Sequence, residues 1–314
     1  MAERSGGSPP GGDARTTVAM ITRNRPDSAL HTLDRLAELP ERPPVVVVDN
    51  GVDPAVTAAL RAHPVGARVL APGRNTGALG RNLAVRRATT PYVAFSDDDS
   101  WWGPGSLRRA ADLLDAHPHL GLLAARSLVG PDERDDPLND LLARSPLPPE
   151  PGLPGRPVLG FLGCACVVRR QAYLDVGGYH PLLFFGAEET LLAYDLAAAG
   201  WGVSYEPSVT AHHHPDPGAR PGRSALLRRN ALLTAWLRRP AHVALRHTLE
   251  LGAATFRGED GAATALRGAL ARAPRAVRQR RRLPARTEQR VRLLEGNARA
   301  AKGLSGAGKK GSAA

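Results

Sequence analysis

The sequence has little cysteine, few aromatic residues and no long apolar run, and each shortage excludes a class of protein. Two cysteines among 314 residues exclude a disulfide scaffold and a four-cysteine zinc site. No apolar run approaches the ~18 residues that a membrane-spanning helix needs. The first twenty residues are rich in Gly, Pro and charge, so they lack the apolar core of a signal peptide. We therefore expect a cytoplasmic location.

Positive charge is concentrated at the end of the chain. The whole sequence carries a net charge of +12, whereas residues 241–314 alone carry 16 Lys and Arg against 5 Asp and Glu. The remaining residues are close to neutral. Phe256 is the one aromatic residue in this basic segment. Nucleic acid is therefore an unlikely partner, because binding to single strands uses interleaved aromatic side chains.

Apolar patterning predicts an α/β fold in the first half of the chain. Apolar runs predict strands over 17–21, 45–48, 68–70 and 92–96, and apolar residues at helical spacing predict helices over 27–39, 53–62, 78–88 and 106–116. Alternating strands and helices with short connections are typical of a mostly parallel, Rossmann-like sheet flanked by helices.

Composition divides the chain into further segments. Residues 1–15 are rich in Gly and Pro and are expected to be disordered. Residues 131–157, rich in Pro and acids, are expected to form a surface loop that separates two halves, 16–130 and 158–240. In the second half we expect helices near 170–176 and 188–199 and strands at 203–205 and 208–211. From residue 224 onward the pattern is helical, and 241–314 is expected to form a basic helical extension with a flexible end.

Polar groups follow each of the four predicted strands of the first half. Ligands of open α/β sheets bind beyond the carboxyl ends of the strands, so these groups predict a binding edge. They are Thr22-Arg23-Asn24-Arg25, Asp49-Asn50-Gly51, Arg74-Asn75-Thr76-Gly77 with Gly80-Arg81-Asn82, and Asp97-Asp98-Asp99.

The three consecutive aspartates are the strongest of these signals. On an extended segment Asp97 and Asp99 point the same way and can face one ligand. Such closely spaced carboxylates suit Mg²⁺ or Mn²⁺, which complete their shells with phosphates and water. The alternative is a capped turn with solvated acids.

Two further clusters follow in the second half. Glu188-Glu189 is either ordinary helix-start chemistry or a general base whose proton affinity is raised by its neighbour. In His212-His213-His214, alternation along a strand directs inward either His213 or the other two, and an inward imidazole suits Mn²⁺. Cys164 and Cys166 are interpreted as small packing residues.

The order of these motifs resembles that of the family 2 glycosyltransferases of GT-A fold, from about Thr16 to Pro240. The resemblance extends into the second half through Gly163, Arg169-Arg170, Val176-Gly177-Gly178-Tyr179, Gly186-Ala187-Glu188-Glu189, Gly200-Trp201 and Pro207. It implies an inverting, metal-dependent enzyme that moves a sugar from a nucleotide-sugar donor to an acceptor hydroxyl. A glycan, a lipid-linked molecule and a small molecule remain open as acceptors.

The resemblance also implies residue roles. The residues that would bind the nucleotide-sugar donor are Thr22, Arg23, Asp49, Asn75, Gly77, Arg81, Asp97 and Asp98. Asp97, Asp99 and His213 correspond to the ligands of Mn²⁺ or Mg²⁺. The catalytic base corresponds to Glu189, with Glu188 as the other candidate. Because many acceptors of such enzymes are lipid-linked, we interpret the basic tail as a peripheral contact with anionic lipid at the inner face of the membrane. A solvated helical face is the alternative.

The sequence departs from the family pattern at the second acidic motif, which is usually Glu-Asp. Leu191 replaces a common polar residue, and Asp195 stands where a basic one is common. Two other functions remain open: a GT-A-like nucleotidyltransferase, and a non-catalytic protein that binds sugar nucleotides or nucleic acid. The first would need a glycine-rich, lysine-bearing loop after the first strand, and residues 23–26 contain neither glycine nor lysine.

Overall fold

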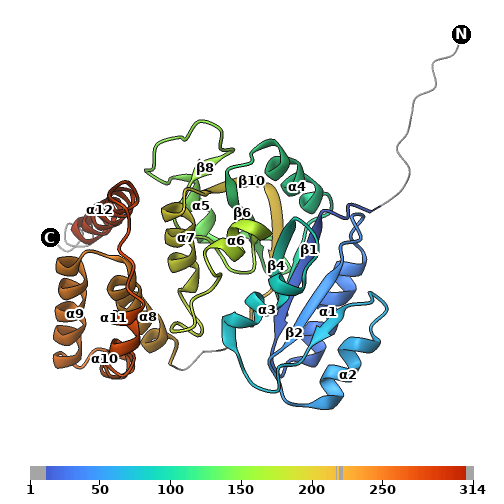
Figure 1. Cartoon of the computed structure of the whole chain (residues 1–314), viewed down its shortest axis with the longest axis horizontal. Helices are drawn as coiled ribbons and strands as arrows, with labels where there is room; N and C mark the ends of the chain where they lie inside the picture. The colour runs from blue at the N-terminus through green and yellow to red at the C-terminus, as the bar shows by residue number, and fades with distance from the viewer. Residues whose placement is uncertain (1–11, 217, 219–221, 309–314) are drawn as a thin grey trace, which may run out of the picture.

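A ten-stranded sheet flanked by helices organises the computed structural model, which describes residues 12–216, 218 and 222–308 (Figure 1). The strands are β1 (Thr16–Thr22), β2 (Val45–Asp49), β3 (Arg68–Leu70), β4 (Tyr92–Asp97), β5 (Ser100–Trp102), β6 (Leu120–Val129), β7 (Arg134–Asp135), β8 (Arg156–Pro157), β9 (Cys166–Arg169) and β10 (Gly202–His213).

Helices alternate with the strands at first and then follow one another to the end of the described chain. They are α1 (Pro26–Ala37), α2 (Pro54–Ala62), the 3-10 helix η1 (Gly77–Leu79), α3 (Gly80–Arg87), α4 (Ser106–Ala116), α5 (Pro137–Ala143), α6 (Arg170–Asp175), α7 (Glu188–Ala198), α8 (Arg223–Arg238), α9 (Ala241–Phe256), α10 (Ala262–Leu270), α11 (Ala273–Arg278) and α12 (Ala285–Gly308). Among these described residues, none of the helices is both long and apolar enough to cross a membrane.

The main sheet is mixed, with strand order β3-β2-β1-β4-β9-β6-β10-β5. Strands β3, β2, β1 and β4 run parallel, as the alternating pattern predicts. Strand β9 then pairs antiparallel with both β4 and β6, and β5 pairs antiparallel with β10. The expected α/β fold with a helical C-terminal region is confirmed, and the antiparallel strands come from the second half and from β5.

Both faces of the sheet are covered, because successive residues of a strand point to opposite faces. In β2, Val45 and Val47 belong to one apolar cluster, whereas Val46 and Val48 belong to another. Helices α1, α2 and α4 pack into the first cluster, and α3, α6 and α7 pack into the second. This double cover explains why β2 is a continuous valine run.

A third apolar cluster joins the C-terminal helices to the body. Leu183 and Leu191 pack there with Leu233 of α8 and with apolar residues of α9, α10 and α11. The expected boundary near residue 240 therefore falls between α8 and α9, two helices that pack on each other. In Figure 1 these helices form the group at one end of the molecule, beside α7.

Several predicted elements differ from the structure. Strands β6 and β9 were not predicted from the sequence; β9 begins near the end of the apolar segment 158–168, to which no element was assigned. The expected strands at 203–205 and 208–211 are one strand, β10, whose pairing with β6 shifts register between Glu206 and Thr210. Pro207 lies within that shift, where a residue without an N–H group does not have to donate. The expected loop 131–157 contains α5.

The two ends of the chain are only partly described. Of the expected disordered start, residues 1–11 lie outside the described residues, whereas Arg15 is ordered on the body, where it pairs with Asp13, Asp112 and Asp115. The expected flexible end at residues 309–314 lies outside the described residues.

Candidate active site

Three parallel strands bring the sequence-predicted residues to one edge of the sheet. Thr22 and Asp49 end β1 and β2 and are register partners, and Asp97 ends β4 opposite Ile21. The carboxyl ends of these strands therefore meet, as expected from the strand order. The turn after β4 carries Asp98 and Asp99 to the same edge.

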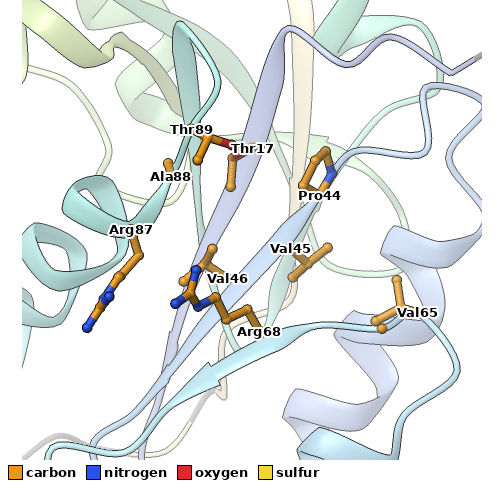
Figure 2. A pocket seen from close by; sticks show the side chains of 10 residues that line it. Thr17, Pro44, Val45, Val46, Val65, Arg68, Arg87, Ala88 and Thr89 are labelled. Atoms are coloured by element: carbon orange, nitrogen blue, oxygen red, sulfur yellow. The ribbon is translucent and has the colours of Figure 1, made fainter.

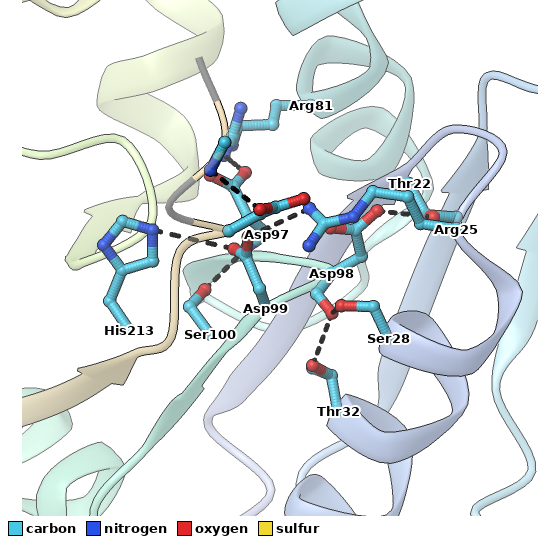
Figure 3. Close-up of polar contacts among 12 residues, drawn as sticks. Thr22, Arg25, Ser28, Thr32, Arg81, Asp97, Asp98, Asp99, Ser100 and His213 are labelled. Atoms are coloured by element: carbon cyan, nitrogen blue, oxygen red, sulfur yellow. Dashed lines mark hydrogen bonds and ion pairs between the residues drawn. The ribbon is translucent and has the colours of Figure 1, made fainter. Parts of the chain in front are cut away.

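Asp97 pairs with a buried cation. Arg81 of α3 is 2% exposed, and its guanidinium donates a hydrogen bond to Asp97 Oδ1 (Figure 3). The guanidinium carbon also lies 5.5 Å from the centre of the Phe95 ring. Arg81 Nε is buried without a hydrogen-bond partner in the described structure. A buried arginine with an unused donor is suited to bind an anionic group that enters beside Asp97.

Asp98 is held by β1 and α1 (Figure 3). Its carboxylate accepts hydrogen bonds from Thr22 Oγ1 at 2.8 Å and from Arg25 Nη1 at 2.7 Å, and its carbonyl oxygen accepts from Ser28 and Thr32 at 2.7 and 2.8 Å. Burial raises the pKa of Asp98 to about 6, opposed by the bond from Thr22. Asp98 and Thr22 are thus hydrogen-bonded to each other, and their role in donor binding stays a prediction.

Asp99 points toward His213, which lies in β10 and is distant from it in the sequence. Its Oδ2 accepts a bond of 2.9 Å from Arg25 Nη1. Its Oδ1 is buried, has no hydrogen-bond partner among the described residues, and lies 3.6 Å from His213 Nε2. The β5–β10 pairing puts His213 opposite Ser100, which explains this approach. Arg25 was not selected from the sequence, although it lies in the first quoted motif.

The other two histidines pack around Trp101 instead. His212 stacks on that ring with 5.8 Å between ring centroids, and its Nδ1 lies 3.2 Å from Glu133 Oε1. His214 packs edge-on against the same ring with 4.6 Å between centroids. Of the three, His213 therefore faces Asp99, which was one of the two orientations that alternation allowed.

Among the described residues, no three His, Cys, Asp or Glu side chains are arranged to hold a metal ion, although Asp99 and His213 lie close enough to share one. Two ligands at right angles on an ion with bonds of ~2.1 Å stand about 3 Å apart, close to the separation of Asp99 Oδ1 and His213 Nε2. The unpartnered Oδ1 atom and the imidazole form a mixed oxygen and nitrogen pair. Asp97, at the start of the same turn, would add a carboxylate, which is paired with Arg81 in this structure.

Glu188 and Glu189 open α7 and have raised pKa values. Glu188 is 3% exposed, and its Oε2 has no hydrogen-bond partner among the described residues. Burial, and then the charge of Glu189, raises the pKa of Glu188 to about 8. Burial also raises the pKa of Glu189. The charge of Arg81 lowers the pKa of both glutamates, and the charge of Asp97 raises it. The aspartate turn and the glutamate pair therefore interact electrostatically.

Gly163 makes room for Glu189. A Cβ atom at Gly163 would stand 2.7 Å from Glu189 Oε1 and 3.6 Å from the hydroxyl of Tyr179. That hydroxyl is buried without a hydrogen-bond partner. Glu189 is partly exposed, whereas Glu188 is buried.

The remaining predicted donor-binding residues lie at the ends of β1 and β2 and in the segment after β3. Asp49 accepts from Gly51 N at 2.8 Å and from Thr57 Oγ1 at 2.6 Å. Asn75 Oδ1 accepts from Gly77 N at 2.9 Å. Arg23 is exposed just beyond β1. Cys164 and Cys166 are free and buried, which confirms them as packing residues.

A pocket of about 210 Å³ lies at the opposite edge of the sheet (Figure 2). It is lined by residues at the amino ends of the first strands, including Thr17, Val45 and Arg68. The acidic clusters contribute nothing to it, so the chemistry that the sequence predicts does not belong there.

Comparison with known proteins shows the family of the chain. The family model described as "Glycosyl transferase family 2" matches residues 17–177. An N-acetylglucosaminyl-diphospho-decaprenol L-rhamnosyltransferase of Mycobacterium tuberculosis is 29% identical over 212 residues, covering 55% of this chain and 67% of the relative.

Solved structures share the fold at low identity. A mannosyltransferase of Pyrobaculum calidifontis, solved with GDP-Man and Mn²⁺, gives a TM-score of 0.53 at 20% identity and covers 95% of this chain and 81% of its own. GalNAc-T7, solved with UDP, GalNAc and Mn²⁺, gives a TM-score of 0.54 at 13% identity and covers 71% of this chain. S. aureus TarS gives a TM-score of 0.52 at 20% identity and also covers 71% of this chain. The match spans only 48% of the GalNAc-T7 chain and 40% of the TarS chain.

Proposed function

Because the chain belongs to glycosyl transferase family 2 and is a glycosyltransferase, we propose that it transfers a sugar from a nucleotide-sugar donor to an acceptor hydroxyl with inversion, using a divalent ion. The observation that carries this proposal is the convergence of the Asp97–Asp99 turn and the Glu188–Glu189 pair around the buried Arg81.

At the donor side, Asp97, Asp99 and His213 would hold Mn²⁺ or Mg²⁺. When bound, such an ion neutralises the charge that develops on a departing nucleoside diphosphate. Arg81 lies beside Asp97 and has a free Nε donor, so we assign it to the diphosphate oxygens. Asp49 and Asn75, with Thr22, Arg23, Gly77 and Asp98, are proposed to shape the nucleoside site.

At the acceptor side, one glutamate removes a proton. The acceptor oxygen forms a bond to the anomeric carbon while the bond from that carbon to the diphosphate oxygen breaks, and the leaving group takes the electron pair. The acceptor proton passes to a carboxylate. We assign this role to Glu189, which is partly exposed and lies against Gly163. Burial raises the pKa of Glu189, and the charge of Asp97 adds to that shift.

The acceptor that we propose is a lipid-linked glycan. The relative from Mycobacterium tuberculosis is named for a diphospho-decaprenol substrate. Residues 261–287 contain eight arginines and no acidic residue. Leu270 and Val277 are exposed within that segment, the latter by 69%. Exposed apolar and basic side chains together favour contact with an anionic lipid surface, at what we expect to be the inner face of the membrane.

Vesicle sedimentation tests the membrane contact. The full chain is expected to bind vesicles of phosphatidylglycerol and phosphatidylcholine, and to bind less as salt is raised. Replacement of Arg275, Arg278 and Arg282 by Gln should weaken that binding. Equal binding to pure phosphatidylcholine vesicles would contradict the electrostatic part of the proposal.

Donor binding is tested by calorimetry with UDP, GDP, UDP-GlcNAc and GDP-Man, with and without Mn²⁺. We expect one nucleoside diphosphate to bind only with the metal, and Asp99→Asn to lose that binding. Metal-independent binding of equal affinity in both proteins would remove the divalent ion from the proposal. Binding without any release of sugar from a sugar nucleotide would favour a non-catalytic protein.

A further inference from the structure

A buried asparagine of α8 holds the loop that leads into the two glutamates. Asn230 is fully buried, and its side-chain amide donates to the carbonyl oxygens of Leu183 at 3.0 Å and Phe185 at 2.9 Å. The same amide nitrogen also contacts the carbonyl oxygen of Gly186. Three carbonyl oxygens of one loop therefore converge on a single NH₂ group.

The orientation of that amide is fixed from its other side. Arg229 Nε donates to Asn230 Oδ1 at 2.9 Å, and Arg229 Nη2 donates to the carbonyl of Leu183 at 2.8 Å. An amide rotated by half a turn would place its oxygen against three carbonyl oxygens and its nitrogen against a guanidinium. Aspartate at position 230 would meet the same repulsion, because a carboxylate only accepts hydrogen bonds.

The loop needs such support because its backbone is strained. Phe184, Gly186 and Ala187 have φ angles of +65°, +86° and +61°. Non-glycine residues in the left-handed region are strained and persist only where the surroundings hold them. Glu188 and Glu189 follow Ala187 directly, so the positions of their carboxylates depend on this backbone.

The opposite side of the loop contacts residues 77 and 78, in the segment after β3. The carbonyl oxygen of Phe184 accepts from Ala78 N at 2.8 Å, and a Cβ at Gly77 would stand 2.4 Å from the same oxygen. Asn50 binds the same segment, since its Oδ1 accepts from Thr76 N at 2.9 Å. The loop is thus held between the C-terminal helices and the segment after β3.

We propose that Asn230, oriented by Arg229, is a positioning residue that fixes the 183–187 loop and thereby the carboxylates of Glu188 and Glu189. The effect on catalysis rests on the proposed function, whereas the effect on the loop does not. A displacement of ~1 Å at reacting groups can cost about 10²-fold in rate, so loss of the amide should lower turnover far more than donor affinity.

The test compares Asn230→Ala with Asn139→Ala. Asn139 is also a buried asparagine bound to backbone, since its amide donates to the Ser127 carbonyl at 2.8 Å, but it lies on α5. Hydrogen exchange is measured at the amides of Ala78 and of residues 184–189. We expect faster exchange there in Asn230→Ala and parent-like exchange in Asn139→Ala. Parent-like exchange in both would overturn the proposal.

Activity supplies a second, separate measurement. With the sugar nucleotide that is hydrolysed or transferred by the parent, we expect kcat to fall about 10–10²-fold in Asn230→Ala with KM for the donor within about threefold. Equal losses in both alanine variants would reduce Asn230 to a stability role and overturn the proposal. Arg229→Lys, which loses the Nε donor, is the milder variant if Asn230→Ala does not fold. An inactive parent would refute the proposed function, while the exchange measurement would still decide on the loop.

Discussion

At the scale of single residues, the two adjacent glutamates have different surroundings although they share a charge environment. Glu188 is buried with an unpartnered carboxylate oxygen, and Glu189 is partly exposed beside Gly163. The greater exposure of the Glu189 residue favours it as the base, although burial raises the pKa of both carboxyls. The sequence alone could not separate the two, because both occupy the first turn of the same helix.

Glutamine substitution separates their roles. Glu189→Gln should bind the donor normally and transfer sugar about 10²–10⁴-fold more slowly, because glutamine cannot take the proton. Glu188→Gln should lose less. Single-turnover transfer and calorimetric donor affinity are measured for each variant. If Glu188→Gln is the more damaged, the base is Glu188; if both remain active, the pair has only a helix-start role.

The raised pKa values of the pair predict how stability depends on pH. Glu188 titrates at about 8 in the folded protein, against an ordinary value of 4.5. Between these values the folded state holds a proton that the unfolded state has released, so the free energy of unfolding should fall as pH rises. One proton changes it by about 1.4 kcal/mol per pH unit at most.

Thermal melts between pH 5 and pH 9 measure this effect without substrate. Melting temperature should fall through the window and level off above it. The slope should be smaller in Glu188→Gln, which keeps the side-chain shape without the titration. An unchanged slope would show that the carboxyl titrates near its ordinary value. Turnover should instead rise with pH, because the base Glu189 must be deprotonated and burial raises its pKa.

At the scale of helices and strands, the sequence predicted most of the elements in residues 16–130 and fewer of those that follow. The valine run of β2 and the Asp53 cap of α2, which accepts from Ala55 N at 2.9 Å, are local signals and were recognisable. Strand β6 carries a mixed apolar pattern that depends on its neighbours, β9 and β10. Strand β5 is only three residues long and exists because β10 pairs with it.

The same limit applies to the site. Asp97, Asp99 and the glutamates follow recognisable element boundaries, so the sequence could identify them. Arg25 and Asn230 act through partners that are distant in sequence, and nothing local distinguishes them from other polar residues on helices. The structure also accounts for Asp195, which departs from the family pattern: it forms an ion pair with Arg238.

That ion pair links α7 to α8 and is largely removed from solvent. Arg238 Nε and Asp195 Oδ1 are 2.5 Å apart, with side-chain exposures of 8% and 13%. Removing one partner of a buried pair leaves an uncompensated charge and typically costs about 3–5 kcal/mol. Asp195→Asn should therefore lower the urea midpoint of unfolding markedly. Asp140→Asn removes an exposed pair with Arg144 and should have little effect.

At the scale of the whole molecule, the C-terminal helices complete the body. Ending the chain after Pro240 would expose the apolar faces of Leu233, Leu237 and Leu183, which pack against α9, α10 and α11. We expect the truncated protein to melt at a lower temperature and to bind a hydrophobic dye, because large apolar faces lose their cover. Removing only residues 309–314 is the matched control. A truncated protein that melts like the full chain would show that the extension is an independent unit.

The pairing of β5 with β10 has a consequence for the order in which the chain is made. Synthesis proceeds from the N-terminus, so the aspartate turn leaves the ribosome long before its partner histidine exists. Ser100 and His213 are strand partners across more than a third of the chain, and contacts of such high contact order form late because a long loop must close first. A nascent chain that ends in α7 already has its aspartates and glutamates, yet it lacks the imidazole, β10 and Asn230. A chain whose synthesis stops before β10 therefore lacks part of the acidic edge.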